Sequence, residues 1–137
     1  MIEIQVLGNE KTAGWLSRHQ QPFLSSGLKC GFLPALDGAR AGARPDAWLI
    51  DADGCDEKPL NRVLDDLNQN GLADAAPLIV MAQTLPLDVA SEALTRGARR
   101  FLSKPVTSRM LSDTCAELGI SVRLALKTLV ILEDRNS

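Results

Sequence analysis

Short apolar runs alternate along this chain with longer stretches of helical spacing, and this alternation constrains the fold more than any other feature. The runs cover residues 2–7, 28–33, 47–50, 78–81 and 101–102. A strand that is buried on both faces reads as a continuous apolar run, and helices between such strands favour a parallel sheet. The pattern therefore predicts an α/β protein with five parallel strands.

The stretches between the runs supply the helices. Helices are predicted over residues 11–23, 59–70 and 86–96, and a last helix begins near Ser108. The glycine-rich residues 37–45 predict a loop or a short, poor helix. Strands and helices in this order are typical of a flavodoxin-like, doubly wound five-stranded parallel sheet, whose ligands bind at the carboxyl ends of the strands.

Composition narrows the classes of function. A chain of 137 residues suits one domain, and its formal net charge of -2 gives no reason to expect a nucleic-acid surface. No apolar run approaches the ~20 residues that cross a bilayer, and the first residues do not form a secretory signal. The three cysteines lack metal-ligand spacing. We therefore expect a cytoplasmic protein that contacts neither membranes nor nucleic acids directly.

The residues that follow the strands carry the candidate site. They are residues 8–10, 51–53, 82–84 and 103–105. Asp51 directly follows a predicted buried strand and Lys104 follows the last strand, so both side chains should reach one crevice. There the lysine would hold the aspartate ionised or neutralise a phosphoryl group attached to it, although a purely structural ion pair is an equal alternative.

Two segments resemble the receiver domains of bacterial response regulators. The segment PDAWLIDADG is similar to their phosphoacceptor strand, and APLIVMAQTLPLDVASEALTRGARRFLSKPV is similar to their last two strands with the helix between. The likeness covers about residues 1–118. It implies a two-component signalling module rather than an enzyme, with a sensor kinase or an output domain as its protein partner.

The resemblance also implies roles for single residues. Asp51 stands where receivers carry the phosphorylated aspartate, and Lys104 stands at their pocket lysine. Pro105 stands at the proline that commonly follows a cis peptide bond, and Phe101 at the aromatic switch residue.

Two positions depart from the receiver pattern. Ala82 stands where receivers carry a hydroxyl residue, and Gly8 and Asn9 stand where they carry an acidic pair that holds Mg²⁺. Alanine cannot donate a hydrogen bond, and asparagine offers Mg²⁺ only a neutral carbonyl. Glu10 or Asp53 could join Asp51 as metal ligands if their loops turned inward. We therefore expect weak Mg²⁺ binding at most.

Three functions remain open on these residues. The favoured one is a degenerate receiver that is independent of phosphorylation or only weakly phosphorylated, and that acts by protein–protein interaction. The alternative is a working phosphoacceptor receiver that is phosphorylated on Asp51 and controls an output domain missing from this chain. A flavodoxin-like nucleotide binder is disfavoured because neither a G-x-G-x-x-G motif nor a Walker loop occurs.

The end of the chain has apolar residues at heptad spacing. They are Leu111, Cys115, Leu118, Val122, Ala125, Leu129 and Leu132. This spacing predicts an extended C-terminal helix, with residues 119–137 forming a linker or dimerisation helix after the domain of residues 1–118. Gly119 costs about 1 kcal/mol in a helix relative to alanine, so a break is expected there. We expect a homodimer through this helix, with folding back onto the domain as the alternative.

Overall fold

The computed structural model describes residues 1–55 and 59–120, and a five-stranded parallel sheet forms its centre. The strands lie in the order β2-β1-β3-β4-β5. Their bounds are β1 (Ile2–Gly8), β2 (Leu28–Pro34), β3 (Ala47–Asp51), β4 (Leu78–Ala82) and β5 (Ala98–Ser103). Every pair of neighbours is parallel, which confirms the predicted flavodoxin-like sheet.

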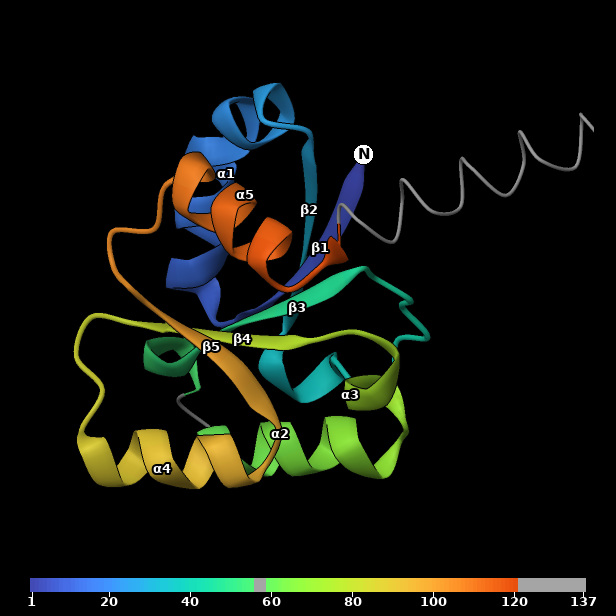
Figure 1. The fold of residues 1–137 in the computed structure, drawn as a ribbon, viewed down its shortest axis with the longest axis vertical. Coiled ribbons are helices and arrows are strands. Elements are labelled where there is room, and N and C mark those ends of the chain that lie inside the picture. Colours follow the sequence, from blue (N-terminus) through green and yellow to red (C-terminus); the bar gives the residue numbers. More distant parts are fainter. Residues whose placement is uncertain (56–58, 121–137) are drawn as a thin grey trace, which may run out of the picture.

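Helices cover both faces of the sheet (Figure 1). On one face lie α1 (Glu10–Ser25) and α5 (Ser108–Glu117). On the other lie α2 (Leu60–Gln69), the short α3 (Leu72–Ala75) and α4 (Leu87–Thr95). Within residues 1–55 and 59–120, no helix is long and apolar enough to span a membrane.

Each face of the sheet has its own hydrophobic core, which explains why the strands read as continuous apolar runs. In β3, Leu49 packs into the core beneath α1 and α5, whereas Trp48 and Ile50 pack into the core above α2. Successive side chains of a strand point to opposite faces, so a strand covered on both sides is apolar throughout. The first polar residue after this run is Asp51, which lies at the carboxyl edge of the sheet.

Two elements differ from the prediction. Strand β5 begins at Ala98 rather than Phe101, because the exposed Arg99 and Arg100 lie in an edge strand that tolerates polar side chains. Residues 37–45 agree with the prediction, because they form a loop after a 3₁₀ turn, Ala35–Asp37, that ends at their first residue. Helix α3 was not predicted, because four residues are too few to show a period.

The structure corrects part of the predicted dimer seam, the apolar residues at heptad spacing from Leu111 to Leu132. Leu111 and Cys115 are fully buried in the core beneath α1 and α5, so these two positions pack against their own sheet and not against a partner. A 3.6-residue period facing a sheet resembles a heptad over two turns, which is why the sequence misled here. Helix α5 ends at Glu117 and Gly119 has φ of +80°, consistent with the predicted break. Val122, Ala125, Leu129 and Leu132 lie outside the described residues.

Candidate functional site

Asp51 lies at the centre of a polar cluster at the carboxyl end of β3. Its side chain caps a 3₁₀ turn, η2 (Ala52–Gly54), because its Oδ1 accepts a hydrogen bond of 3.0 Å from the backbone N–H of Asp53. Only 4% of the Asp51 surface is exposed. A carboxylate this buried needs charged or hydrogen-bonding partners, and the neighbouring elements supply them.

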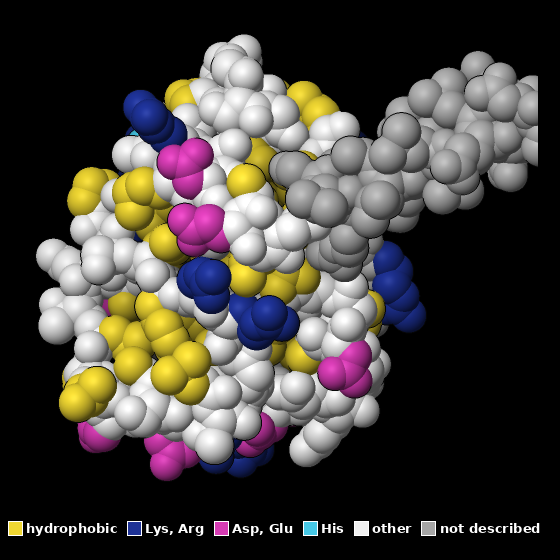
Figure 2. All heavy atoms as spheres, viewed as in Figure 1, with side chains coloured by type: hydrophobic (Ala, Val, Ile, Leu, Met, Phe, Trp, Pro, Cys, Tyr) yellow, Lys and Arg dark blue, Asp and Glu magenta, His cyan; other side chains and the backbone are white. Residues whose placement is uncertain are grey.

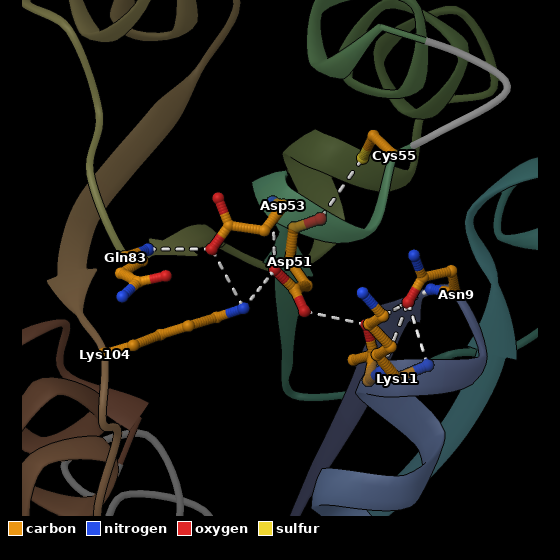
Figure 3. Close-up of polar contacts among 8 residues, drawn as sticks. Asn9, Lys11, Asp51, Asp53, Cys55, Gln83 and Lys104 are labelled. Carbon is orange, nitrogen blue, oxygen red and sulfur yellow. Dashed lines mark hydrogen bonds and ion pairs between the residues drawn. The ribbon is translucent and has the colours of Figure 1, made fainter.

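Lys104 is the cationic partner, and it bridges two carboxylates (Figure 3). Its Nζ lies 2.7 Å from Asp51 Oδ1 and 3.0 Å from Asp53 Oδ2. A backbone hydrogen bond positions the lysine, because its N–H donates to the carbonyl of Ala82 at 3.0 Å. The peptide bond from Lys104 to Pro105 is cis. Burial by itself would lower the pKa of Lys104, but the hydrogen bonds and charges of the two aspartates outweigh it and raise the pKa.

Asp53 connects this ion pair to the segment after β4. Its Oδ2 accepts a hydrogen bond of 2.8 Å from the backbone N–H of Gln83. Burial alone would raise the pKa of Asp53, yet the Gln83 N–H and the Lys104 ammonium more than offset it and the pKa is lowered. The network therefore joins the ends of β3, β4 and β5 through one cation.

Thr12 completes the cluster from the other side, and sequence reasoning missed it. The Thr12 hydroxyl donates a 2.7 Å hydrogen bond to Asp51 Oδ2, in a buried setting. Its position follows from the start of α1, where the Asn9 side chain accepts hydrogen bonds from the backbone N–H groups of Lys11 and Thr12. The capping-box spacing of Asn9 and Thr12 was a visible signal for their local contact. Nothing in the sequence pointed from Thr12 to Asp51.

Within residues 1–55 and 59–120, the polar groups around Asp51 pair with one another and do not fit a divalent cation. Mg²⁺ prefers octahedral oxygen ligands and one or two carboxylates. Here an ammonium and a hydroxyl proton already engage both Asp51 oxygens, and Gly8 offers no side chain. Glu10 is exposed at the start of α1 and Asn9 serves as the helix cap, so neither joins Asp51. Across residues 1–55 and 59–120, no group of three acidic, histidine or cysteine side chains could hold a metal ion.

Ala82 and Phe101 lie together beside this cluster rather than in it. Both line a cavity of about 240 Å³ between β4, β5 and the start of α4, together with Leu85 and Ala90. Phe101 is half-buried. The methyl group of Ala82 can neither donate nor accept a hydrogen bond, so no side-chain bond joins this cavity to the Asp51 cluster through residue 82.

Comparison with known proteins shows which solved structures share this fold. The sequence matches no protein-family model and no curated protein. Among solved structures, a signal receiver domain from Vibrio parahaemolyticus aligns with TM-score 0.70 and 20% identity over 94% of this chain and 96% of that chain. A receiver domain protein from Clostridium thermocellum aligns with TM-score 0.68 and 21% identity over 95% and 99% of the two chains.

A third match carries a metal. The receiver domain of a sensor histidine kinase from Pseudomonas aeruginosa, whose structure has a magnesium ion coordinated in its active site cleft, aligns with TM-score 0.64 and 16% identity over 82% of this chain and 93% of that chain. The sheet order, the helix placement and these alignments agree. The fold of this chain is that of the CheY-like response-regulator receiver domains.

Proposed function

We propose that this chain is a receiver-like signal-transduction module of a two-component-type system that works without phosphorylation and acts through protein contacts. The observation that carries the proposal is that both oxygens of the buried Asp51 carboxylate already accept hydrogen bonds. Oδ1 accepts from Lys104 and from the Asp53 backbone, and Oδ2 accepts from Thr12. An aspartate whose two oxygens are both hydrogen-bonded in this way is better suited to holding neighbouring elements together than to attacking a phosphorus atom.

Phosphoryl transfer to Asp51 would have to break this arrangement. The transferred group brings negative charge, which a divalent ion normally offsets. The cluster contains two carboxylates and one ammonium, and its described residues do not fit a metal ion. The Lys104 ammonium already neutralises one of the two carboxylates, so the charge balance of the cluster disfavours a further anion.

A phosphoryl group on Asp51 would also lack the contacts that could transmit a change to the protein surface. A bound phosphoryl group could change the fold only through contacts that differ between two states. Ala82 supplies no donor for a phosphoryl oxygen, and Phe101 borders a cavity next to that methyl group. A sensor kinase or an output domain would therefore recognise one constant surface of this module, independent of the chemistry at Asp51.

Treatment with acetyl phosphate and Mg²⁺, followed by intact-mass measurement, tests the proposal. We expect the mass to remain that of the untreated chain, and Asp51→Asn to behave identically. An NMR correlation spectrum recorded with and without beryllofluoride should likewise be unchanged around Asp51 and Phe101. A phosphoryl adduct that appears in the wild type and is lost in Asp51→Asn would support the working receiver instead.

We further propose that the module self-associates through its C-terminal residues. Val122, Leu129 and Leu132 continue the apolar spacing past the domain, and a large side chain buried at a contact contributes about 1.5–3 kcal/mol before association costs. Sedimentation should show a dimer that becomes monomeric in Val122→Glu/Leu129→Glu, because these changes place charges in the seam.

The matched control is a chain that ends at residue 121. This end point keeps Ile120, which is buried in the core, and removes the seam. The shortened chain should stay folded and monomeric. A monomeric wild type at tens of micromolar, or a dimeric double glutamate variant, would rule out this interface and favour the helix folding back onto its own domain.

A further inference from the structure

The corner between β1 and α1 has no room for two side chains. Gly8 is the last residue of β1, and a Cβ built on it would lie 2.1 Å from Thr12 Oγ1. A Cβ on Gly54 would lie 2.6 Å from the same oxygen. Real Cβ atoms do not approach other atoms this closely, so Thr12 as placed excludes a side chain at position 8 and at position 54.

The Thr12 hydroxyl has hydrogen-bond partners on two sides. Its oxygen accepts a hydrogen bond of 3.1 Å from the backbone N–H of Asn9, and of its two acceptors Asp51 Oδ2 at 2.7 Å is closer than Asn9 Oδ1 at 3.4 Å. Only 1% of the Thr12 surface is exposed. A hydroxyl that donates to a carboxylate over so short a distance forms a charge-assisted bond, which is among the stronger hydrogen bonds in proteins.

We propose that Thr12 is the residue that keeps divalent cations away from Asp51. Its proton takes the place of a cation at Oδ2, and its methyl and hydroxyl groups fill the volume that a carboxylate at position 8 would require. Thr12 acts through Asp51 and is a positioning residue. This assignment rests on the proposed function, because it names the contact that holds the site closed.

The assignment makes positions 8 and 12 a coupled pair. A Cβ at position 8 would lie 2.6 Å from Thr12 Cβ, so with the backbone as it stands an acidic residue there fits only if position 12 has no side chain at all. Conversely, the Thr12–Asp51 bond requires glycine at position 8. The missing acidic residue and the buried threonine are therefore one structural feature rather than two.

Thermal unfolding with MgCl₂ alone, against NaCl at equal ionic strength, tests the proposal. Wild type and the conservative Thr12→Ser should show no rise in Tm that is specific to Mg²⁺. Thr12→Ala frees Oδ2 and should gain a Mg²⁺-dependent rise, because a ligand that binds the folded state stabilises it. The variant Gly8→Asp/Thr12→Gly also removes the Cβ that a side chain at position 8 would meet at 2.6 Å, and it should gain a larger rise that saturates with concentration. If Thr12→Ala and Gly8→Asp/Thr12→Gly both ignore Mg²⁺, the assignment is wrong.

A double-mutant cycle gives a second measurement that needs no metal. Gly8→Ala alone should raise the unfolding equilibrium constant by roughly tenfold or more, as overpacking of a closed site does. A Cβ at position 8 would also lie 2.6 Å from Thr12 Cβ, which alanine keeps, so the matching background is Thr12→Gly. In the Thr12→Gly background the same change should raise the unfolding equilibrium constant by less than about threefold, because the side chain that it would meet is gone. Equal effects in both backgrounds would refute the steric exclusion.

The outcomes separate this inference from the function on which it rests. Saturable Mg²⁺ binding by the wild type would overturn the closed-site function and this assignment together. A wild type that ignores Mg²⁺, combined with variants that also ignore it and with an additive cycle, would overturn the assignment of Thr12 alone.

Discussion

Two neighbouring regions differ in how fully their side chains are in contact with other residues: the corner formed by Asp51, Thr12 and Lys104, and the face formed by α4 and β5. In the corner, the hydroxyl of Thr12 and the ammonium of Lys104 engage both oxygens of a carboxylate that is almost wholly buried. On the α4–β5 face, Leu87 is 83% exposed and Leu94 is 55% exposed. Figure 2 shows hydrophobic side chains gathered between α4 and β5.

This difference teaches that one edge of a fold can have its polar groups paired internally while the neighbouring face leaves large apolar side chains exposed. We expect the paired groups around Asp51 to contribute to stability and the exposed leucines to contribute little. The following changes are ways to break or sharpen this contrast.

Lys104→Met should have the largest effect. It leaves Asp51 buried and removes the cation that Asp53 shares, so the free energy of unfolding should fall by about 2–4 kcal/mol. This range lies below that of a fully buried pair because the lysine side chain is 29% exposed. Urea unfolding at pH 7 measures it.

The matched control removes both charges of the pair. Asp51→Asn/Lys104→Met should be more stable than Lys104→Met alone, because no uncompensated carboxylate remains at position 51. If the single and double variants unfold at the same urea concentration, the ion pair contributes through packing alone. The charges at Asp51 would then not be what distinguishes this corner from the α4–β5 face.

Acidification should have the next largest effect. The pKa of Asp53 is lowered in the fold, so its contribution to stability is present above the ordinary value of 3.8 and is lost as the pH falls through the folded value. The pKa of Lys104 is raised, so its contribution is complete below 10.5 and is lost only at more alkaline pH. Stability from this pair should therefore be flat from pH 5 to pH 8.

The test compares wild type with Asp53→Asn across pH. The wild type should be the more stable protein at pH 7, and the gap should close on going below about pH 4, because protonated Asp53 no longer pairs with Lys104. A gap that stays constant down to pH 3 would mean that the Asp53 charge contributes nothing to folding.

Leu87→Ser/Leu94→Ser should have the smallest effect. Both side chains are mostly exposed, so the free energy of unfolding should change by at most about 0.5 kcal/mol. Urea unfolding at pH 7 checks this value. A loss well above 1 kcal/mol would show that the face is covered in solution, and the two regions would then differ less than the exposures indicate.

The expectation that Asp51 and Lys104 would lie at one edge and pair is met in the structure, whereas Asp53 was expected only as a metal ligand and instead pairs with Lys104. Parallel strands bring their carboxyl ends to one edge, so an aspartate after β3 and a lysine after β5 had to be near each other. Glu10 fails as a partner because helix geometry turns it outward beside the Asn9 cap. The full length of β5 was missed because edge residues need not be apolar.

By itself, the sequence determined that the sheet is parallel and flavodoxin-like and that polar residues follow its strands at their carboxyl ends. It also determined that position 82 has no hydroxyl group, because the residue there is Ala82. These follow from local pattern and from the fixed direction of parallel strands. Only the tertiary structure decided which group hydrogen-bonds to Oδ2 of Asp51, because the Thr12–Asp51 bond joins residues 39 positions apart. Its existence depends on the absence of a side chain at Gly8 and Gly54. Steric exclusion of this kind depends on tenths of an ångström between packed elements, and no periodicity or motif encodes it.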